Sequence, residues 1–155
     1  MDDTAITGGA AARVAVPWHF WAVGVVSLIW NLFGGYDYWM SRTRNVEYLQ
    51  QATGNAEVFL KWMDGMSLFN QLAWGIGVWG SVLGSVLLLL RSRHAVGAML
   101  VSLVAAAVSF GIECAAGIPA AMDTPALKVM ILVVLGTVLL MWWYAKRAAA
   151  KGWLS

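Results

Sequence analysis

The sequence predicts an all-α protein: a four-helix transmembrane bundle with a short amphipathic helical segment in its first loop. The 155 residues are 61% hydrophobic and only 12% charged, whereas soluble domains carry about 25% charged residues. The mean hydropathy is +0.71, and so short a chain forms no water-soluble core large enough to bury this much apolar surface. In addition, the chain contains four apolar stretches long enough to cross a bilayer.

The first predicted span covers residues 17–40 and follows a small, polar tail of residues 1–16 that we expect to be mobile. Pro17 suits the first turn of a helix, where a backbone N–H is not needed. Trp18 and Trp39 would lie at the two membrane interfaces, where Trp and Tyr concentrate. The tail lacks the basic start of a signal peptide, so no cleaved targeting segment is expected.

Residues 41–66 form the long hydrophilic segment of the chain, and Thr53-Gly54-Asn55 breaks it into two pieces. After this break, four apolar residues recur at i, i+3, i+4 and i+7, which is one face of a helix. They are Phe59, Trp62, Met63 and Met66. This spacing predicts a short amphipathic helix on the bundle end or the lipid surface. The alternative is a plain solvated loop.

Three further spans are predicted at 67–90, 95–117 and 125–144, followed by a basic tail of residues 146–155. A basic turn, Arg91-Ser92-Arg93-His94, separates the second span from the third. Pro119 and Pro125 break the chain before the fourth span, because proline interrupts a helix. The single membrane domain therefore extends over residues 17–145.

Glycines mark two places where helices are expected to pack closely. Gly80 and Gly84 form a GxxxG pair in the second span, and small residues at this spacing let helix backbones approach one another. We expect this pair to pack within the chain rather than between two chains. Gly34 and Gly35 in the first span would let another helix, or a ligand, come close.

An even number of spans places both termini on one side of the membrane. Six Lys and Arg residues lie on that side and four on the other. The positive-inside rule therefore predicts cytoplasmic termini and an external segment 41–66.

Two polar residues of the predicted spans are singled out by their depth. Asn31 sits deep in the first span, and Glu113 is the one carboxylate near the middle or outer half of a span. A carboxylate in the bilayer is costly, so Glu113 is either a proton-titrating or substrate-pairing group, or a residue near the interface that is neutral or hydrogen-bonded. Asn31 either holds a ligand or bridges two helices. The second interpretation is favoured, because intramembrane amides most often form interhelical hydrogen bonds.

Polar residues from three spans are expected to meet in the outer half of the bundle. Asp37 would form an ion-pair cluster with Arg42 and Arg44, close to the start of the second span. The whole candidate polar zone consists of Asn31, Tyr36, Asp37, Asn70, Gln71 and Glu113. The alternative to a binding pocket is a helix-end network whose members satisfy one another.

Several classes of function have little support in the sequence. His19 and His94 both fall at the predicted cytoplasmic face but lack a paired spacing within one helix, and Cys114 is the single cysteine. We therefore predict no metal and no cofactor, and the absence of a recognisable catalytic motif disfavours an enzyme. The net charge of +2 is too small to indicate a nucleic-acid partner.

The stretch from Trp30 to Ser41, continuing to Arg44-Asn45 and Tyr48-Leu49, resembles a family of small four-span bacterial membrane proteins. The later stretch from Leu83 to Arg93 is similar as well. The family is largely uncharacterised, and some of its members carry the label "sugar transporter". The resemblance implies a location in the bacterial inner membrane, and it transfers no functional residue to this chain.

Two functions remain open on the sequence alone. The first is a structural or accessory membrane protein that binds partners within the bilayer, either another membrane protein or further copies of itself. The second is an oligomeric transporter of a small solute, such as a sugar, or a proton-coupled carrier, which would use the polar zone. Four spans are few for a monomeric carrier, and the two halves of the chain show no convincing inverted repeat.

Overall fold

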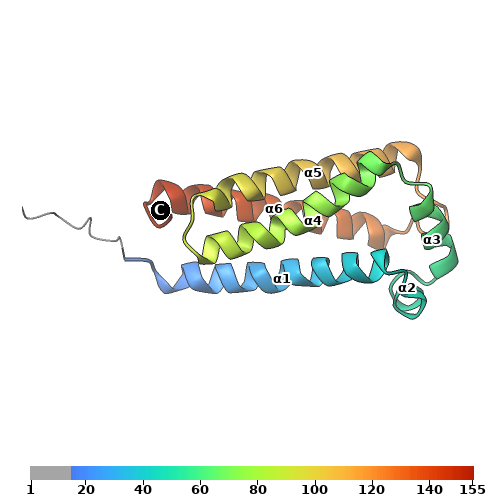
Figure 1. The fold of residues 1–155 in the computed structure, drawn as a ribbon, viewed down its shortest axis with the longest axis horizontal. Helices are drawn as coiled ribbons and strands as arrows, with labels where there is room; N and C mark the ends of the chain where they lie inside the picture. The colour runs from blue at the N-terminus through green and yellow to red at the C-terminus, as the bar shows by residue number, and fades with distance from the viewer. Residues whose placement is uncertain (1–14) are drawn as a thin grey trace, which may run out of the picture.

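The computed structural model describes residues 15–155, and every regular element in this range is a helix (Figure 1). The predicted tail of residues 1–16 lies almost entirely outside the described residues. The elements in chain order are α1 (Trp18–Arg42), α2 (Val46–Thr53), α3 (Ala56–Asp64), α4 (Leu68–Leu89), α5 (His94–Ala116) and α6 (Pro125–Ala150). The four long helices run side by side. The short helices α2 and α3 cover one end, called here the α2–α3 end, and the chain terminates at the opposite, C-terminal end.

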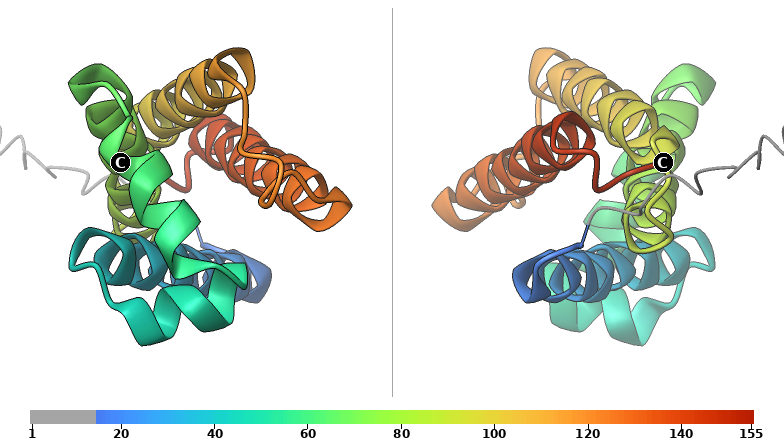
Figure 2. Two further views of the ribbon diagram at one scale, coloured as in Figure 1. Left: turned by 90° about the vertical axis from the view of Figure 1, so that its right-hand side faces the viewer. Right: turned by 90° about the vertical axis from the view of Figure 1, so that its left-hand side faces the viewer.

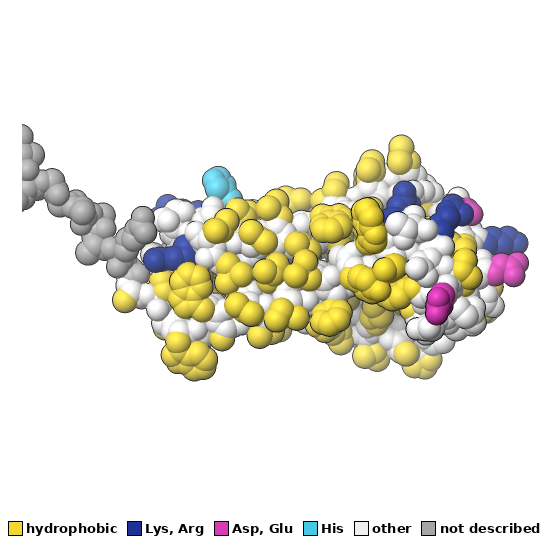
Figure 3. Space-filling model, turned by 60° about the horizontal axis from the view of Figure 1, so that its bottom comes forward, with side chains coloured by type: hydrophobic (Ala, Val, Ile, Leu, Met, Phe, Trp, Pro, Cys, Tyr) yellow, Lys and Arg dark blue, Asp and Glu magenta, His cyan; other side chains and the backbone are white. Residues whose placement is uncertain are grey.

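Three helices of the described chain are long and apolar enough to cross a membrane. These are α4, α5 and α6, whose most apolar windows have mean hydropathies of 1.8, 2.2 and 2.2. Helix α1 has 25 residues, so it is as long as the others, but Asn31, Tyr36 and Asp37 lower its hydropathy. On the face seen in Figure 3, hydrophobic side chains cover the middle of the molecule, and charged side chains gather towards its two ends.

Helix α4 lies at the centre of the packing, between α1 and α5. Its small residues face α5 closely: a Cβ added at Gly77 would lie 3.2 Å from the backbone nitrogen of Ala106. A Cβ at Gly84 would lie 2.9 Å from the Met99 sulfur, and one at Gly80 would lie 3.1 Å from a side-chain carbon. The GxxxG pair therefore packs within the chain.

Helix α6 packs against α5 along its second half and diverges from the bundle along its first half (Figure 2). Its buried residues are Val138, Ala145 and Ala148, and residues 125–137 contain none. Only 6% of its apolar window is buried, compared with 33% for α4 and 28% for α5. The bundle is therefore not closed between α1 and α6 at the α2–α3 end.

Two short helices, rather than one, occupy the hydrophilic segment of residues 41–66. Gly54 ends α2 with a left-handed φ of 76°, and the Asn55 side chain accepts a hydrogen bond from the Val58 amide to begin α3. The break at Thr53-Gly54-Asn55 lies between them. Met63 is buried as part of the expected apolar face, whereas Met66 lies beyond the end of α3.

The basic tail makes contacts that were not predicted from the sequence. Helix α6 continues to Ala150, and the residues after it fold back on the α4–α5 turn. The Ser155 amide donates to the Arg91 carbonyl at 2.7 Å, and the Arg93 amide donates to the Ser155 carbonyl at 3.1 Å.

Leu154 is 1% exposed. It completes the apolar core of the C-terminal end, which consists of Phe20, Leu88, Ala95, Ala145, Ala148 and Leu154. The tail is ordered because this apolar residue is buried with α1, α4, α5 and α6.

Candidate functional site

The residues of the predicted polar zone belong to four separate hydrogen-bond networks rather than one pocket. Each network connects a different set of helices, and three of them lie at the α2–α3 end. The positions of these networks determine what each of the candidate residues is able to do.

The first network holds α1, α4 and α6 together through Asn31. Its amide nitrogen donates to the Ser85 hydroxyl at 2.8 Å, to the Ser81 carbonyl at 3.2 Å and to the Met141 sulfur at 3.5 Å. Asn31 is 5% exposed. Asn31 therefore forms hydrogen bonds between helices. None of its partners belongs to the predicted polar zone.

The second network joins the start of α4 to the last turns of α5. The Ser109 hydroxyl donates to a Glu113 carboxylate oxygen at 3.2 Å, and the Asn70 side chain lies near the same carboxylate. Asn70 and Ser109 are each 2% exposed. The side-chain oxygen Oδ1 of Asn70 is buried and has no hydrogen-bond partner among the described residues. The network brings together two of the predicted residues, Asn70 and Glu113, and leaves this one acceptor unsatisfied.

The third network links the end of α1 to α2. Asp37 accepts a hydrogen bond of 2.7 Å from the Tyr48 hydroxyl, and the ring of Tyr36 lies edge-on to that of Tyr48, with 5.5 Å between centroids. Two main effects raise the pKa of Tyr48 to about 12. Partial burial is the larger effect, and the hydrogen bond to Asp37 is the next largest. The phenol of Tyr48 therefore stays protonated and keeps α2 attached to α1.

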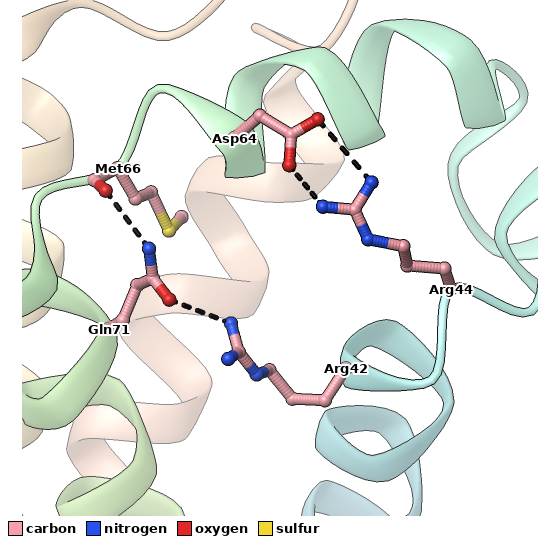
Figure 4. A network of polar contacts seen from close by, with 5 residues as sticks. All are labelled: Arg42, Arg44, Asp64, Met66 and Gln71. Carbon is pink, nitrogen blue, oxygen red and sulfur yellow. Dashed lines mark hydrogen bonds and ion pairs between the residues drawn. The ribbon is translucent and has the colours of Figure 1, made fainter.

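The fourth network surrounds a polar cavity of about 160 Å³ (Figure 4). Arg42 at the end of α1 donates to the side-chain oxygen Oε1 of Gln71 at 2.9 Å, and the side-chain nitrogen Nε2 of Gln71 donates to the Met66 backbone carbonyl at 3.0 Å. Arg44 forms a two-bond ion pair with Asp64 at the end of α3. Because Arg42 meets an amide rather than a carboxylate, its guanidinium retains the capacity to bind a small carboxylate or phosphate.

The expected ion-pair cluster of Asp37 with Arg42 and Arg44 is wrong. Arg44 has a left-handed φ of 55°, a conformation uncommon for residues other than glycine. The chain turns here, and α3 lies back over the end of α1, so that Asp64 becomes the partner of Arg44. Asp37 faces α2 instead.

The two glycines of α1 differ in their surroundings. A Cβ at Gly35 would lie 3.8 Å from Trp79 and Val82 of α4, which is ordinary contact. A Cβ at Gly34 would have no atom within 4 Å, so this glycine faces open space. Gly35 is thus part of the α1–α4 packing, whereas Gly34 is free to accommodate a close approach from outside.

The remaining metal and cysteine candidates do not gather into a site. The His19 ring lies edge-on to Trp153 at 5.7 Å, and His94 is exposed at the start of α5. Cys114 is also exposed. Within residues 15–155, no group of three or more His, Cys, Asp or Glu side chains is placed to hold a metal ion.

The partners that complete these networks were not predicted from the sequence. Ser81 and Ser85 each follow a residue of the GxxxG pair, so their common face was a signal that Asn31 would meet them. Tyr48 and Asp64 had no comparable signal, because their positions depend on how α2 and α3 fold back over α1.

In comparisons with known proteins, no family model matches this chain, and no curated protein or solved structure shows significant similarity to it. The function must therefore be argued from the chain's own geometry.

Proposed function

We propose that this chain is a four-span structural or accessory protein of the bacterial inner membrane, and that it binds a transmembrane helix of a partner protein along the first half of α6. The observation that carries the proposal is the unequal packing of the apolar helices. Helix α6 has the same mean hydropathy as α5, yet 6% rather than 28% of its apolar window is buried. Helix α1 does not cover the first half of α6, and a partner helix would cover it instead.

The length and surface of α1 support its role as the fourth span. Its 25 residues extend over about 37 Å at 1.5 Å per residue, which exceeds the hydrocarbon thickness of about 30 Å. Val26 and Phe33 are 65% and 69% exposed, as expected for side chains in contact with lipid. With four spans, both termini lie on one side, and the cations of the C-terminal end favour the cytoplasm for that side.

The surface of α6 supports a helix as the partner. Val129, Met130 and Leu132 are 57–70% exposed. A Cβ at Gly136 would have no atom within 4 Å, and helices in membranes approach one another most closely at small residues. The first half of α6 therefore has an apolar surface and, at Gly136, a point where a second helix could approach closely. Both lie within the apolar part of α6, which a transmembrane partner would contact.

The proposal is tested by placing a photo-crosslinking side chain at Leu132 and, as a matched control, at Val104 of α5, which is 54% exposed. Native mass spectrometry of the gently extracted protein first establishes whether a second protein is bound at fixed stoichiometry. We expect the Leu132 variant to form a covalent adduct with that protein and the Val104 variant not to do so. Adducts with lipid alone would contradict the proposal, and an adduct with a second copy of this chain would assign the surface to a homo-oligomer.

A second candidate is a proton-coupled or small-solute carrier, in which several copies share one pathway. The observation that favours it is the network of Glu113 with Asn70, since a carboxylate in an apolar helix is usually functional. In this case Glu113→Gln would abolish flux into vesicles without lowering the melting temperature. If the unmodified chain supports no flux and Glu113→Gln only lowers the melting temperature, the role of Glu113 is structural.

A further inference from the structure

Three cations near the end of α6 lie over indole rings. The Lys146 ammonium is 4.8 Å from the centroid of Trp142, and the Arg147 guanidinium carbon is 4.0 Å from that of Trp143. The Lys151 ammonium is 4.6 Å from the centroid of Trp153. All three cationic side chains are exposed. A cation–π contact holds a cation in place without neutralising its charge, so these three residues form a fixed cationic surface.

The charges of the molecule are segregated between its two ends. The acidic residues of the described chain are Asp37, Glu47, Glu57, Asp64, Glu113 and Asp123. All of them lie on the helices and loops of the α2–α3 end, and both ion pairs of residues 15–155 are found there. No Asp or Glu side chain of residues 15–155 therefore lies beside the cationic surface, and neither ion pair of these residues involves it, so its charge is available to an external anion.

The depth of this surface in the membrane follows from the length of α6. Its 26 residues extend over about 39 Å, and the hydrocarbon core of a bilayer is about 30 Å thick. When the apolar stretch lies in the hydrocarbon, the last turns of the helix reach the headgroup region. Trp143, which is 46% exposed, belongs to the side-chain type that concentrates at this interface.

We propose that Lys146, Arg147 and Lys151 bind the phosphate of an anionic phospholipid headgroup in the leaflet at the C-terminal end. Three cations, held at headgroup depth and without an Asp or Glu side chain of residues 15–155 beside them, favour a lipid that carries a net negative charge over a zwitterionic one. The indole rings restrict the motion of the cations before the lipid arrives, which lowers the entropic cost of binding. The inference holds whether or not α6 receives a partner helix.

The test is a titration of the full chain in detergent with phosphatidylglycerol or phosphatidylcholine, with bound lipid counted by native mass spectrometry. We expect phosphatidylglycerol to bind more tightly to the unmodified chain. The variant K146Q/R147Q should bind it on the order of tenfold or more weakly, since each cation near an anionic headgroup contributes about fivefold. The control variant K61Q/K128Q removes the same charge at the α2–α3 end and should retain the preference.

Two further measurements keep the proposal open to refutation. The variant K146R/K151R retains the charge and should retain the preference, and added salt should weaken phosphatidylglycerol binding to the unmodified chain. Equal binding of the two lipids, or equal loss of binding in K146Q/R147Q and K61Q/K128Q, would overturn the proposal. Displacement of the lipid by inorganic phosphate, at an ionic strength at which sodium chloride leaves the lipid bound, would assign the surface to a free anion and overturn the proposal as well.

Discussion

The two ends of this bundle are held together by different forces. At the C-terminal end four helices and the end of the chain converge on an apolar core, in which Phe20 and Leu88 have no exposed surface. At the α2–α3 end α6 diverges, and hydrogen bonds and ion pairs among helix ends connect the elements. The comparison teaches that apolar burial stabilises the bundle where the helices meet, whereas short polar networks position the segments where they separate.

The largest expected effect is at the C-terminal core. Replacing Phe20 with Ala leaves a cavity among α1, α6 and the chain end, and we expect a loss of about 3 kcal/mol in the free energy of unfolding. Denaturant unfolding in detergent measures the loss. The control is Phe33→Ala, since Phe33 is 69% exposed, and it should change stability by less than about 0.5 kcal/mol. Equal effects of the two changes would remove the distinction between a packed end and a lipid-facing surface.

A smaller effect is expected in the contact between α4 and α5, which connects the two ends. Gly77→Ala places a methyl group 3.2 Å from the Ala106 backbone, and we expect it to destabilise the protein by about 1–2 kcal/mol. Gly111→Ala is the matched control on α5, because its methyl group meets no atom within 4 Å. The control should be neutral or stabilising, since alanine favours helix more than glycine does. Thermal unfolding distinguishes the two variants.

The hydrogen bond of Asn31 is expected to contribute less than either packing term. A double-mutant cycle of Asn31→Ala with Ser85→Ala should give a coupling free energy of about 0.6 kcal/mol and no more than about 1.7 kcal/mol, the mean and the maximum for hydrogen bonds between membrane helices. The pair Asn31 and Ser102 is the control, because Ser102 donates to Gly77 instead. If the control pair couples as strongly as Asn31 with Ser85, the hydrogen bond is not the source of the coupling.

The smallest effect concerns the polar α2–α3 end. Asp37→Asn removes the charge next to Tyr48, so the pKa of Tyr48 should fall from about 12 towards its ordinary value of 10.0. Ultraviolet titration, with Tyr48→Phe as the reference, measures this change. The folded pKa exceeds the unfolded one, so the contribution of Tyr48 to stability is complete below about pH 10 and is lost as the pH rises through about 12. An unchanged pKa in Asp37→Asn would show that burial alone causes the shift.

Most of the helices and much of their packing were predictable from local patterns. The hydrophobic stretches indicated the long helices, the Thr53-Gly54-Asn55 break marked the boundary of α2 and α3, and the GxxxG pair indicated a close contact. These features depend on residues that are near one another in the chain. Helix-terminating conformations, such as the left-handed φ of Gly54, are likewise set by local chemistry.

The candidate site was less predictable, because its contacts join distant parts of the chain. The polar zone had the right residue types, but Asn31 pairs with Ser85, which lies 54 positions away. Asp37 and Arg44 were expected to pair with one another, and each instead pairs with a residue on a short helix that folds back. A charge pattern along the sequence does not specify which of several nearby opposite charges comes within reach.

The sequence by itself therefore determined that this is a helical protein with apolar helices of membrane length, since hydropathy and helix-breaking residues act locally. Only the tertiary structure decided that α6 diverges from α1, that the polar zone divides into four networks, and that the chain end folds back. The last of these depends on a hydrogen bond between Arg91 and Trp153, 62 positions apart. Such contacts form only where helix packing brings the partners together, and that packing depends on side-chain shapes along entire helices rather than on any one stretch of the chain.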